Sequence, residues 1–301
     1  MSSEPRAIRF GRQDYTYPSD ELGPLRDSGG LVGDRGALLQ RLHEDGYLYL
    51  PGYLNRDDVL AARARVLQYM ADQEGLEPDS RPLDGVMGQY GKPVRLSGQR
   101  DITHCDEVDR ILAGPRLHEL HALIHDEPVI TFDYKWLRAV GNEECTGAHM
   151  DHVYMGRGSQ RLMTVWIPFG DIPIEQGTLC VCPGSHRLPE FETLRNTYGR
   201  MDVDRDRVEG WFTKNPREIT QTFGGFWQTS HVKAGDVITF GMHLVHASTT
   251  NTTERWRLSC DVRYQPTADP ADPRWIGESP PGHSPHQKVT PMAEARAAWG
   301  V

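Results

Sequence analysis

The first third of the chain carries helical patterns. Residues 56–72 place apolar side chains at helical spacing, and Asn55 before them suits an N-cap, with Asp58 in an acidic first turn. Upstream, the run ALLQRLHEDGYLYLPGYL predicts a short helix, a turn at its Asp-Gly step and a strand. Further short helical patterns lie at 106–113 and 116–125.

From Val129 the pattern changes to short β-prone runs separated by turn residues. Residues 186–225 interrupt these runs with short helical patterns and many charged residues. The order predicts one domain, with helices first and then an antiparallel β sandwich or barrel. We expect an N-terminal arm at 1–35 and a helical flank at 36–128. The β core should follow at 129–266, with an insertion at 186–225, and a C-terminal tail at 267–301.

Composition narrows the class of protein. Hydrophobic residues make up 38% of the 301 residues, which is enough apolar material for a core. The net charge of −9 argues against nucleic acid or an anionic membrane as the main partner. The sequence shows no signal peptide and no apolar run long enough to cross a membrane, so we expect a cytoplasmic protein. Nothing in the pattern specifies an oligomeric state.

The five cysteines are too sparse for a disulfide framework. Cys180 and Cys182 form a C-x-C motif in a β-prone run. Because positions two apart share a face of a strand, we expect both to be small buried hydrophobic residues.

The stretch GAHMDHVYMG contains the first candidate chemistry. His149 and Asp151 are two positions apart and would project to the same face of a strand. His246 lies in another apolar, β-prone run further along the chain. Two histidines and one carboxylate form the facial triad of non-haem iron(II) oxygenases, which leaves the opposite face of the metal open. These three residues are therefore the candidate metal ligands and catalytic centre.

Arg257 follows His246 by eleven residues. A guanidinium can bind a carboxylate through two parallel hydrogen bonds. On the strand after the distal histidine, it would anchor the far carboxylate of 2-oxoglutarate. Arg255 has the same parity and competes for this role.

The chain resembles the phytanoyl-CoA dioxygenase family of iron(II)/2-oxoglutarate oxygenases. The resemblance rests on AHMDHVY, MTVWIPFGDI, QGTLCVCPGSH, GDVITFGMHLVHAST and RWRLSCDVRY, in that order. It implies a mainly β protein with flanking helices, built on a double-stranded β-helix or jelly-roll core. It also implies iron(II), 2-oxoglutarate and dioxygen as cofactor and cosubstrates. Under the same resemblance His149, Asp151 and His246 hold the iron, and Arg257, Ser248 and Trp166 contact 2-oxoglutarate.

The retained carboxylate of Asp151 argues against halogenation, because related halogenases replace it with Ala or Gly so that chloride can bind. It favours hydroxylation or another outcome of hydrogen abstraction, and desaturation, epimerisation and ring closure would use the same iron site. We therefore expect a dioxygenase that hydroxylates an unactivated carbon of a small organic substrate, such as a natural product, an amino-acid-like compound or an acyl compound, and releases succinate and carbon dioxide. The alternative is a catalytically silent or structural-metal jelly-roll module. A structural zinc site would normally have four ligands that include cysteine.

The substrate pocket is harder to predict. In FDYKWLRA, Asp133 and Lys135 lie on one face, and Tyr134, Trp136 and Arg138 lie on the other. Both faces carry large residues, so periodicity does not decide between them. By analogy to the family we expect Lys135, together with Asp133, to face the substrate. Candidate lids are 85–100 and 186–225, the latter with Trp211 and Phe212; His152 and His243 should point away from the metal.

Overall fold

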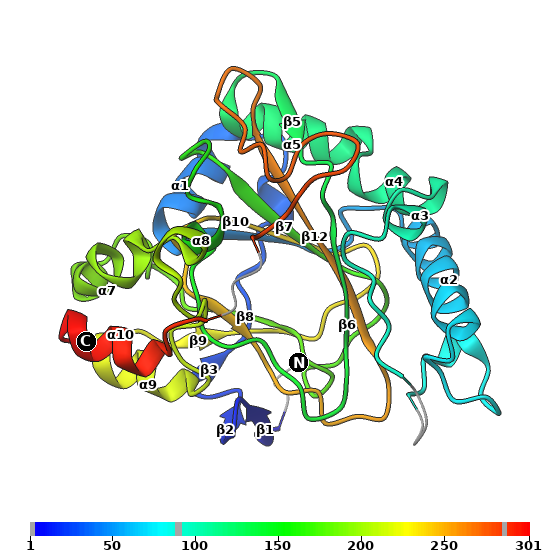
Figure 1. The fold of residues 1–301 in the computed structure, drawn as a ribbon, viewed down its shortest axis with the longest axis horizontal. Coiled ribbons are helices and arrows are strands. Elements are labelled where there is room, and N and C mark those ends of the chain that lie inside the picture. The colour runs from blue at the N-terminus through cyan, green and yellow to red at the C-terminus, as the bar shows by residue number, and fades with distance from the viewer. Residues whose placement is uncertain (1–3, 88–91, 285–287) are drawn as a thin grey trace.

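The computed structural model describes residues 4–87, 92–284 and 288–301. Two β-sheets form the centre, and helices surround them on the outside (Figure 1). The strands are β1 Arg6–Phe10, β2 Gln13–Tyr17, β3 Leu22–Gly23, β4 Tyr47–Leu50, β5 Val129–Thr131, β6 Trp136–Val140, β7 Met163–Pro168, β8 Leu179–Val181, β9 Trp227–Gln228, β10 Val237–Gly241, β11 His246–Ser248 and β12 Arg257–Pro266. The α-helices are α1 Arg35–Asp45, α2 Arg56–Asp72, α3 Arg100–Thr103, α4 Asp106–Leu112, α5 Pro115–His125, α6 His152–Met155, α7 Glu192–Asn196, α8 Val203–Asp206, α9 Pro216–Phe223 and α10 Met292–Trp299.

The larger sheet has the order β4-β10-β7-β12-β5, and β6 also pairs with β12. All of these pairs are antiparallel. The smaller sheet has the order β11-β8-β9-β3. This is the predicted mainly β architecture with flanking helices, and the two sheets of the jelly-roll do not close into a barrel.

The sequence of β12 explains how its two faces differ. All ten residues of the strand are buried, yet polar and apolar side chains alternate along it. The apolar set, Leu258, Cys260, Val262 and Tyr264, belongs to the core beneath the helices. The polar set points to the opposite side, because successive strand residues project to opposite faces. The polar face of β12 therefore lines the space between the two sheets.

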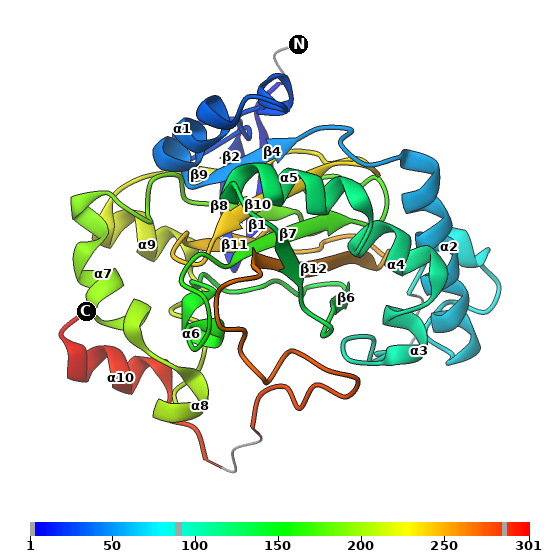
Figure 2. The same cartoon turned by 90° about the horizontal axis from the view of Figure 1, so that it is seen from above.

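Helices α1, α2, α4 and α5 cover the outer face of the larger sheet (Figure 2). Helix α2 has the predicted bounds, and the Asn55 side chain accepts hydrogen bonds from the backbone N–H groups of Asp57 and Asp58 at 2.8 and 3.1 Å. Helix α1 ends at Asp45 and is capped by Gly46, whose φ of 85° places the predicted Asp-Gly turn in the left-handed region that favours glycine. These helices fix the larger sheet from one side and leave its other face for the site.

The N-terminal segment differs from the predicted arm. Strands β1 and β2 form an antiparallel hairpin, and β3 joins the smaller sheet. The hairpin buries Ile8, Phe10, Tyr15 and Tyr17 in a second apolar core. Short alternating segments broken by polar residues give a weak sequence signal, which explains the missed hairpin.

The second core also contains the insertion and the end of the chain. Helices α7 and α9 from the insertion contribute Leu194, Ile219 and Phe223, and α10 from the predicted tail contributes Met292 and Ala295. Cys180 and Cys182 are buried in this core, as predicted, and the structure holds both as free thiols.

Candidate metal centre and adjoining chamber

Three side chains converge between the sheets. His149 precedes α6, Asp151 is the N-cap residue of that helix, and His246 is the first residue of β11. One potential ligand atom from each lies within 4.8 Å of the others, and all three residues are buried. The structure thus brings the three predicted ligands together.

The backbone sets the spacing of the two histidines. His149 and His246 form an antiparallel bridge in which each N–H donates to the other residue's carbonyl oxygen at 3.0 Å. Directly opposed residues in such a pair place their side chains on the same face. The imidazole centroids are consequently 4.0 Å apart.

The ring orientations are fixed by hydrogen bonds on the far side. The Nδ1 atoms of His149 and His246 lie 2.8 and 3.0 Å from the carbonyl oxygens of Gly147 and Leu244. A carbonyl can only accept, so each Nδ1 carries the hydrogen and each Nε2 is left with its lone pair. Both Nε2 atoms face Asp151 Oδ1, at 3.7 and 3.6 Å. This arrangement is the one expected of metal-binding imidazoles.

The other oxygen of Asp151 is held by two donors. Thr164 Oγ1 on β7 and Arg263 Nη2 on β12 both donate to Oδ2, the latter at 3.2 Å. Burial opposes ionisation, but the Arg263 charge and the remaining contacts outweigh it and lower the pKa of Asp151. Burial, with His246 nearby, lowers the pKa of His149 to about 3. The cluster therefore offers a carboxylate and a neutral imidazole, which are the forms that bind metals.

The donor set fits iron(II). Two imidazole nitrogens and one carboxylate oxygen match the facial triad of non-haem iron enzymes. In the part of the chain that the structure describes, the cluster contains three donor residues and no cysteine. A closed four-ligand zinc site is therefore not formed by these residues.

A buried cationic pocket adjoins the triad. Arg257, Ser248 and Trp166 line it together with the three candidate ligands. The Arg257 Nε has no hydrogen-bond partner among the described residues, although the side chain is buried. Burial lowers the pKa of Arg257 to about 10, so the guanidinium stays charged at neutral pH. A buried guanidinium with an unused donor is what an anionic ligand requires.

The hydrogen bonds of Ser248 and Arg255 show which of the two can contact a ligand in this pocket. Ser248 Oγ accepts a hydrogen bond from the Thr146 N–H at 2.8 Å, which leaves the hydroxyl proton to donate to a ligand. Arg255, the competitor for the anchor role, donates instead to the Asp84 carbonyl oxygen at 3.0 Å and does not line the pocket.

A larger chamber opens from the same centre. It shares Arg138, Thr146, His149, Asp151 and Arg263 with the cationic pocket. Its other walls are mostly aromatic and comprise Ser97, Tyr134, Trp136, Tyr154, Met155, Trp211 and His283. A ligand in this chamber would lie directly beside the triad.

The structure does not bring Asp133 and Lys135 to the chamber, and the predicted orientation of this segment is wrong. Both residues line a separate pocket near His104. Lys135 Nζ donates to the Phe132 carbonyl oxygen at 2.7 Å, and Asp133 accepts from the Gly277 N–H at 2.6 Å. The reason lies in β6: its Leu137 face packs into the helix-covered core, so Trp136 and Arg138 face inward.

The predicted lids contribute in part. Trp211 of the insertion lines the chamber, whereas Phe212 is buried in the second core. Ser97 lines the chamber from the first candidate lid, and residues 88–91 of that segment lie outside the described residues. His152 and His243 stack on each other with centroids 4.5 Å apart and line neither pocket.

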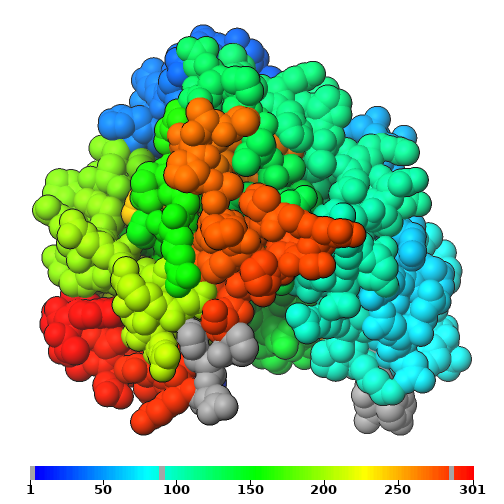
Figure 3. All heavy atoms as spheres, turned by 45° about the horizontal axis from the view of Figure 1, so that its top comes forward, coloured from blue at the N-terminus to red at the C-terminus, as the bar shows by residue number. Residues whose placement is uncertain are grey.

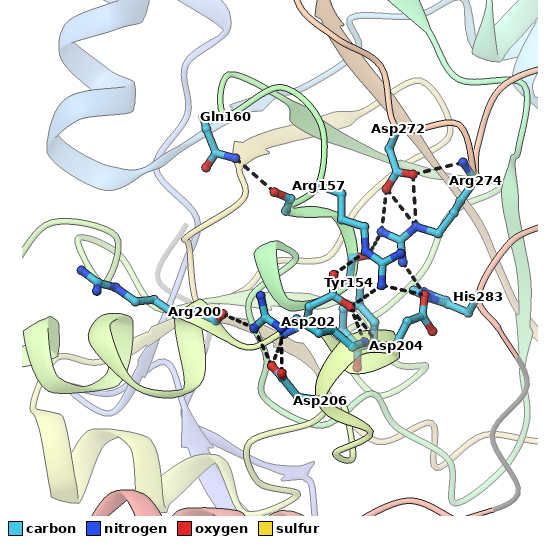
Figure 4. A network of polar contacts seen from close by, with 12 residues as sticks. Tyr154, Arg157, Gln160, Arg200, Asp202, Asp204, Asp206, Asp272, Arg274 and His283 are labelled. Atoms are coloured by element: carbon cyan, nitrogen blue, oxygen red, sulfur yellow. Dashed lines mark hydrogen bonds and ion pairs between the residues drawn. The ribbon is translucent and has the colours of Figure 1, made fainter.

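His283 of the C-terminal segment lines the chamber. Figure 3 shows this segment lying across one face of the molecule in orange and red. A polar network holds it in place (Figure 4). Asp204 of α8 accepts from Arg274, and His283 Nδ1 lies 3.1 Å from Asp204 Oδ2. Arg274 also donates to Asp272 and to the Tyr154 carbonyl oxygen, the latter at 2.9 Å. The network ties the tail to the insertion and to α6.

Sequence reasoning missed Arg263, Arg138, Asp261 and Thr164. A usable signal was present for Arg263, because Arg257, Ser259, Asp261 and Arg263 share the parity of one strand face. The residues that alternate with them along this strand are all apolar.

Residues 42–259 match the family described as phytanoyl-CoA dioxygenase (PhyH). The chain belongs to the phytanoyl-CoA dioxygenase family. Two curated relatives, both called 1-deoxypentalenic acid 11-beta-hydroxylase, come from Streptomyces exfoliatus and Streptomyces arenae. Each is 26% identical and covers 83% of this chain and 88% of its own. The sequence-based assignment is thereby confirmed.

Two solved structures share the fold. The epimerase SnoN from nogalamycin biosynthesis, in complex with Fe3+, alpha ketoglutarate and nogalamycin RO, has a TM-score of 0.56 at 21% identity and covers 85% of this chain and 94% of its own. EctD from S. alaskensis, with 2-oxoglutarate and 5-hydroxyectoine, has a TM-score of 0.56 at 18% identity and covers 97% and 94%.

With its family and its triad, the protein is a non-haem iron(II)- and 2-oxoglutarate-dependent oxygenase that uses dioxygen. Over the described ranges 4–87, 92–284 and 288–301, no helix combines the length and apolarity needed to cross a membrane.

Proposed function

We propose that this member of the phytanoyl-CoA dioxygenase family hydroxylates a carbon atom of a small organic substrate bound in the aromatic chamber. The observation that carries the proposal is the shared wall between two pockets. His149 and Asp151 line both the cationic pocket and the chamber, so a cosubstrate in one and a substrate in the other would meet at the triad.

Each residue has a defined part in this proposal. His149 Nε2, Asp151 Oδ1 and His246 Nε2 would hold iron(II). Arg257 would pair with the distal carboxylate of 2-oxoglutarate, the Ser248 hydroxyl would donate to the same group, and Trp166 would pack beside the cosubstrate. When bound, iron(II) and 2-oxoglutarate supply the oxidising chemistry: dioxygen inserts one atom into a substrate C–H bond and the other into succinate, with loss of carbon dioxide.

The protein supplies geometry around that chemistry. Thr164 and Arg263 hold Asp151 Oδ2 and thereby keep Oδ1 directed at the histidines. The aromatic walls would exclude water from the reacting carbon once the substrate fills the chamber. The retained carboxylate ligand argues against halogenation, and hydroxylation is favoured over the remaining outcomes because the curated relatives are named as hydroxylases.

An anaerobic titration tests the cosubstrate site. Iron(II) and then 2-oxoglutarate are added to the apo-protein, and the visible charge-transfer band of the chelate is recorded. We expect a band in the wild type, a weaker band in Arg257→Ala and none in His246→Ala. Matched controls are Arg255→Ala and His243→Ala, which remove the same side chains from outside both pockets.

The outcomes separate two classes of protein. A band that depends on Arg257 and His246, but not on the controls, supports the oxygenase. Tight iron binding without any band in the folded wild type would mean that 2-oxoglutarate does not chelate the metal there. The oxygenase hypothesis would then be replaced by that of a catalytically silent jelly-roll binding module. Product analysis then distinguishes hydroxylation from epimerisation or ring closure.

A further inference from the structure

The charged residues that line the two connected pockets are unequal in number. They are three arginines and two aspartates: Arg138, Arg257, Arg263, Asp151 and Asp261. Two contacts pair them, since Arg263 binds Asp151 and Arg138 Nε donates to Asp261 Oδ2 at 3.0 Å. One positive charge is left over.

Loading the site with its cofactors does not remove this excess. Iron(II) adds two positive charges, and 2-oxoglutarate adds two negative charges. The loaded centre therefore retains one uncompensated positive charge. When a substrate closes the chamber to water, an uncompensated charge becomes costly, because desolvation of an unpaired ion is unfavourable. A substrate that carries one negative charge would remove that cost.

Arg138 is the place where this charge is accessible. It lines both pockets, and 42% of its side chain is exposed, compared with 3% for Arg263. Its terminal nitrogens have no hydrogen-bond partner among the described residues; only Nε is engaged. Burial opposes its charge, but Asp261 outweighs burial and raises the pKa of Arg138. Arg138 thus presents a charged guanidinium to the chamber, with terminal nitrogens that can donate to a ligand.

Arg138 and Arg257 are placed for different ligands. Arg257 is enclosed in the cationic pocket with Ser248 and Trp166, and it does not line the chamber. Arg138 stands at the junction, on the same inward face of β6 as Trp136. Most of the remaining chamber walls are aromatic, with Tyr134, Trp136 and Trp211 among them. Such walls suit a flat or fused-ring hydrocarbon body.

We propose that Arg138 anchors the substrate, and that the substrate class is a hydrophobic monocarboxylic acid whose acid group pairs with Arg138 while its ring body lies against the aromatic walls. This inference rests on the proposed function. It assigns a specificity-determining role to a residue outside the metal and 2-oxoglutarate contacts.

The test uses anaerobic protein loaded with iron(II) and saturating 2-oxoglutarate. The probes are pairs of equal shape that differ in charge: 2-naphthoate against 2-naphthamide, and adamantane-1-carboxylate against adamantane-1-carboxamide. Binding is followed by tryptophan fluorescence, and the charge-transfer band is recorded in the same sample. We expect each acid to bind at least about tenfold more tightly than its amide, the difference that one good charged contact contributes.

Variants assign that preference to Arg138. In Arg138→Gln we expect the acid and the amide to bind within about threefold of each other, while the affinity for 2-oxoglutarate stays within about threefold of the wild type. Arg138→Lys keeps the charge and should retain part of the preference. Arg255→Gln is the matched control and should behave as the wild type.

Any of four results would overturn the proposal. Equal binding of acids and amides by the wild type, or no binding of either acid below millimolar concentration, would exclude an anion-selective chamber. An unchanged preference in Arg138→Gln would place the anion elsewhere. Loss of the charge-transfer band on adding an acid would show displacement of 2-oxoglutarate. A missing band before any probe is added would instead mark failure of the proposed function.

Discussion

Arg263 donates from Nη2 to Asp151 Oδ2 at 3.2 Å, and both side chains are almost completely buried. The same guanidinium lies over the Trp136 ring, 4.4 Å from its centroid. One arginine therefore connects the carboxylate of the candidate metal centre to an aromatic wall of the chamber.

The first prediction concerns this contact. Arg263→Gln should weaken iron(II) binding about 10- to 100-fold, because partners of ligating carboxylates orient and tune the ligand. It should also lower the free energy of unfolding of the apo-protein by about 3 kcal/mol, since Asp151 would keep a buried charge without its partner. Metal titration and urea unfolding measure the two effects. Arg255→Gln serves as the control, and an unchanged iron affinity in Arg263→Gln would show that the contact is only structural.

Metal binding should stabilise the folded protein. Nickel(II) or iron(II) at about 100 times its dissociation constant should raise the free energy of unfolding by about 2.7 kcal/mol, because the ligands converge only in the folded state. Thermal unfolding with and without metal shows this as a higher midpoint temperature. His149→Ala should abolish the increase, whereas His243→Ala should keep it. An equal increase in His149→Ala would place the metal at another site.

The polar network around Asp204 should govern the substrate but not the cosubstrate. Arg274→Met removes the contacts to Asp204, Asp272 and the Tyr154 carbonyl. We expect faster hydrogen exchange over 267–284 and weaker binding of the naphthoate probe, while the 2-oxoglutarate charge-transfer band remains. Arg187→Met, at the exposed surface, is a suitable control. If the band disappeared together with probe binding, the tail would support the whole centre rather than one wall.

Acid should destabilise the apo-protein through buried histidines. His121 is fully buried, and its Nδ1 and Nε2 lie 2.8 Å from Leu117 O and 3.1 Å from Thr239 Oγ1. Burial lowers the pKa of His121 to about 3 from an ordinary value of 6.5. Below pH 6.5 the unfolded chain binds a proton that the folded chain excludes, so stability is complete above that pH and falls below it.

The size of this effect follows from linkage. Between pH 6.5 and pH 5, His121 should cost about 2 kcal/mol of unfolding free energy, at about 1.4 kcal/mol per pH unit. Urea unfolding of the wild type and of His121→Gln over this range measures the difference in slope. Parallel slopes for the two proteins would show that His121 takes up its proton without unfolding.

Features that depend on hydrophobic periodicity and on local chemistry were predicted well from the sequence. Helix α2 and its Asn55 cap are confirmed, because an amphipathic pattern and a cap reinforce each other locally. The family and the proximity of His149, Asp151 and His246 are confirmed as well. The roles assigned to individual site residues stay predictions until ligands are bound.

The direction in which the side chains of a strand point was harder to predict than the family and the metal ligands. Lys135 was expected to face the substrate, yet β6 turns that side toward the helices because Leu137 packs there. Both faces of this strand carry large side chains, so only the tertiary packing decides between them. Arg138 acquires its place at the junction of the two pockets for the same reason. The N-terminal hairpin was missed because short strands on their own carry little pattern.

The attachment of the C-terminal segment has a consequence for how the protein is made and handled. The triad is complete once the chain has been synthesised as far as His246, and Arg257 follows soon after, but His283 and Arg274 emerge later. The chamber therefore receives this part of its wall only after the residues of the metal centre have been synthesised. A deletion within residues 267–284 would leave the residues of the triad in place while changing the chamber, so substrate screens should be run on protein that retains this segment.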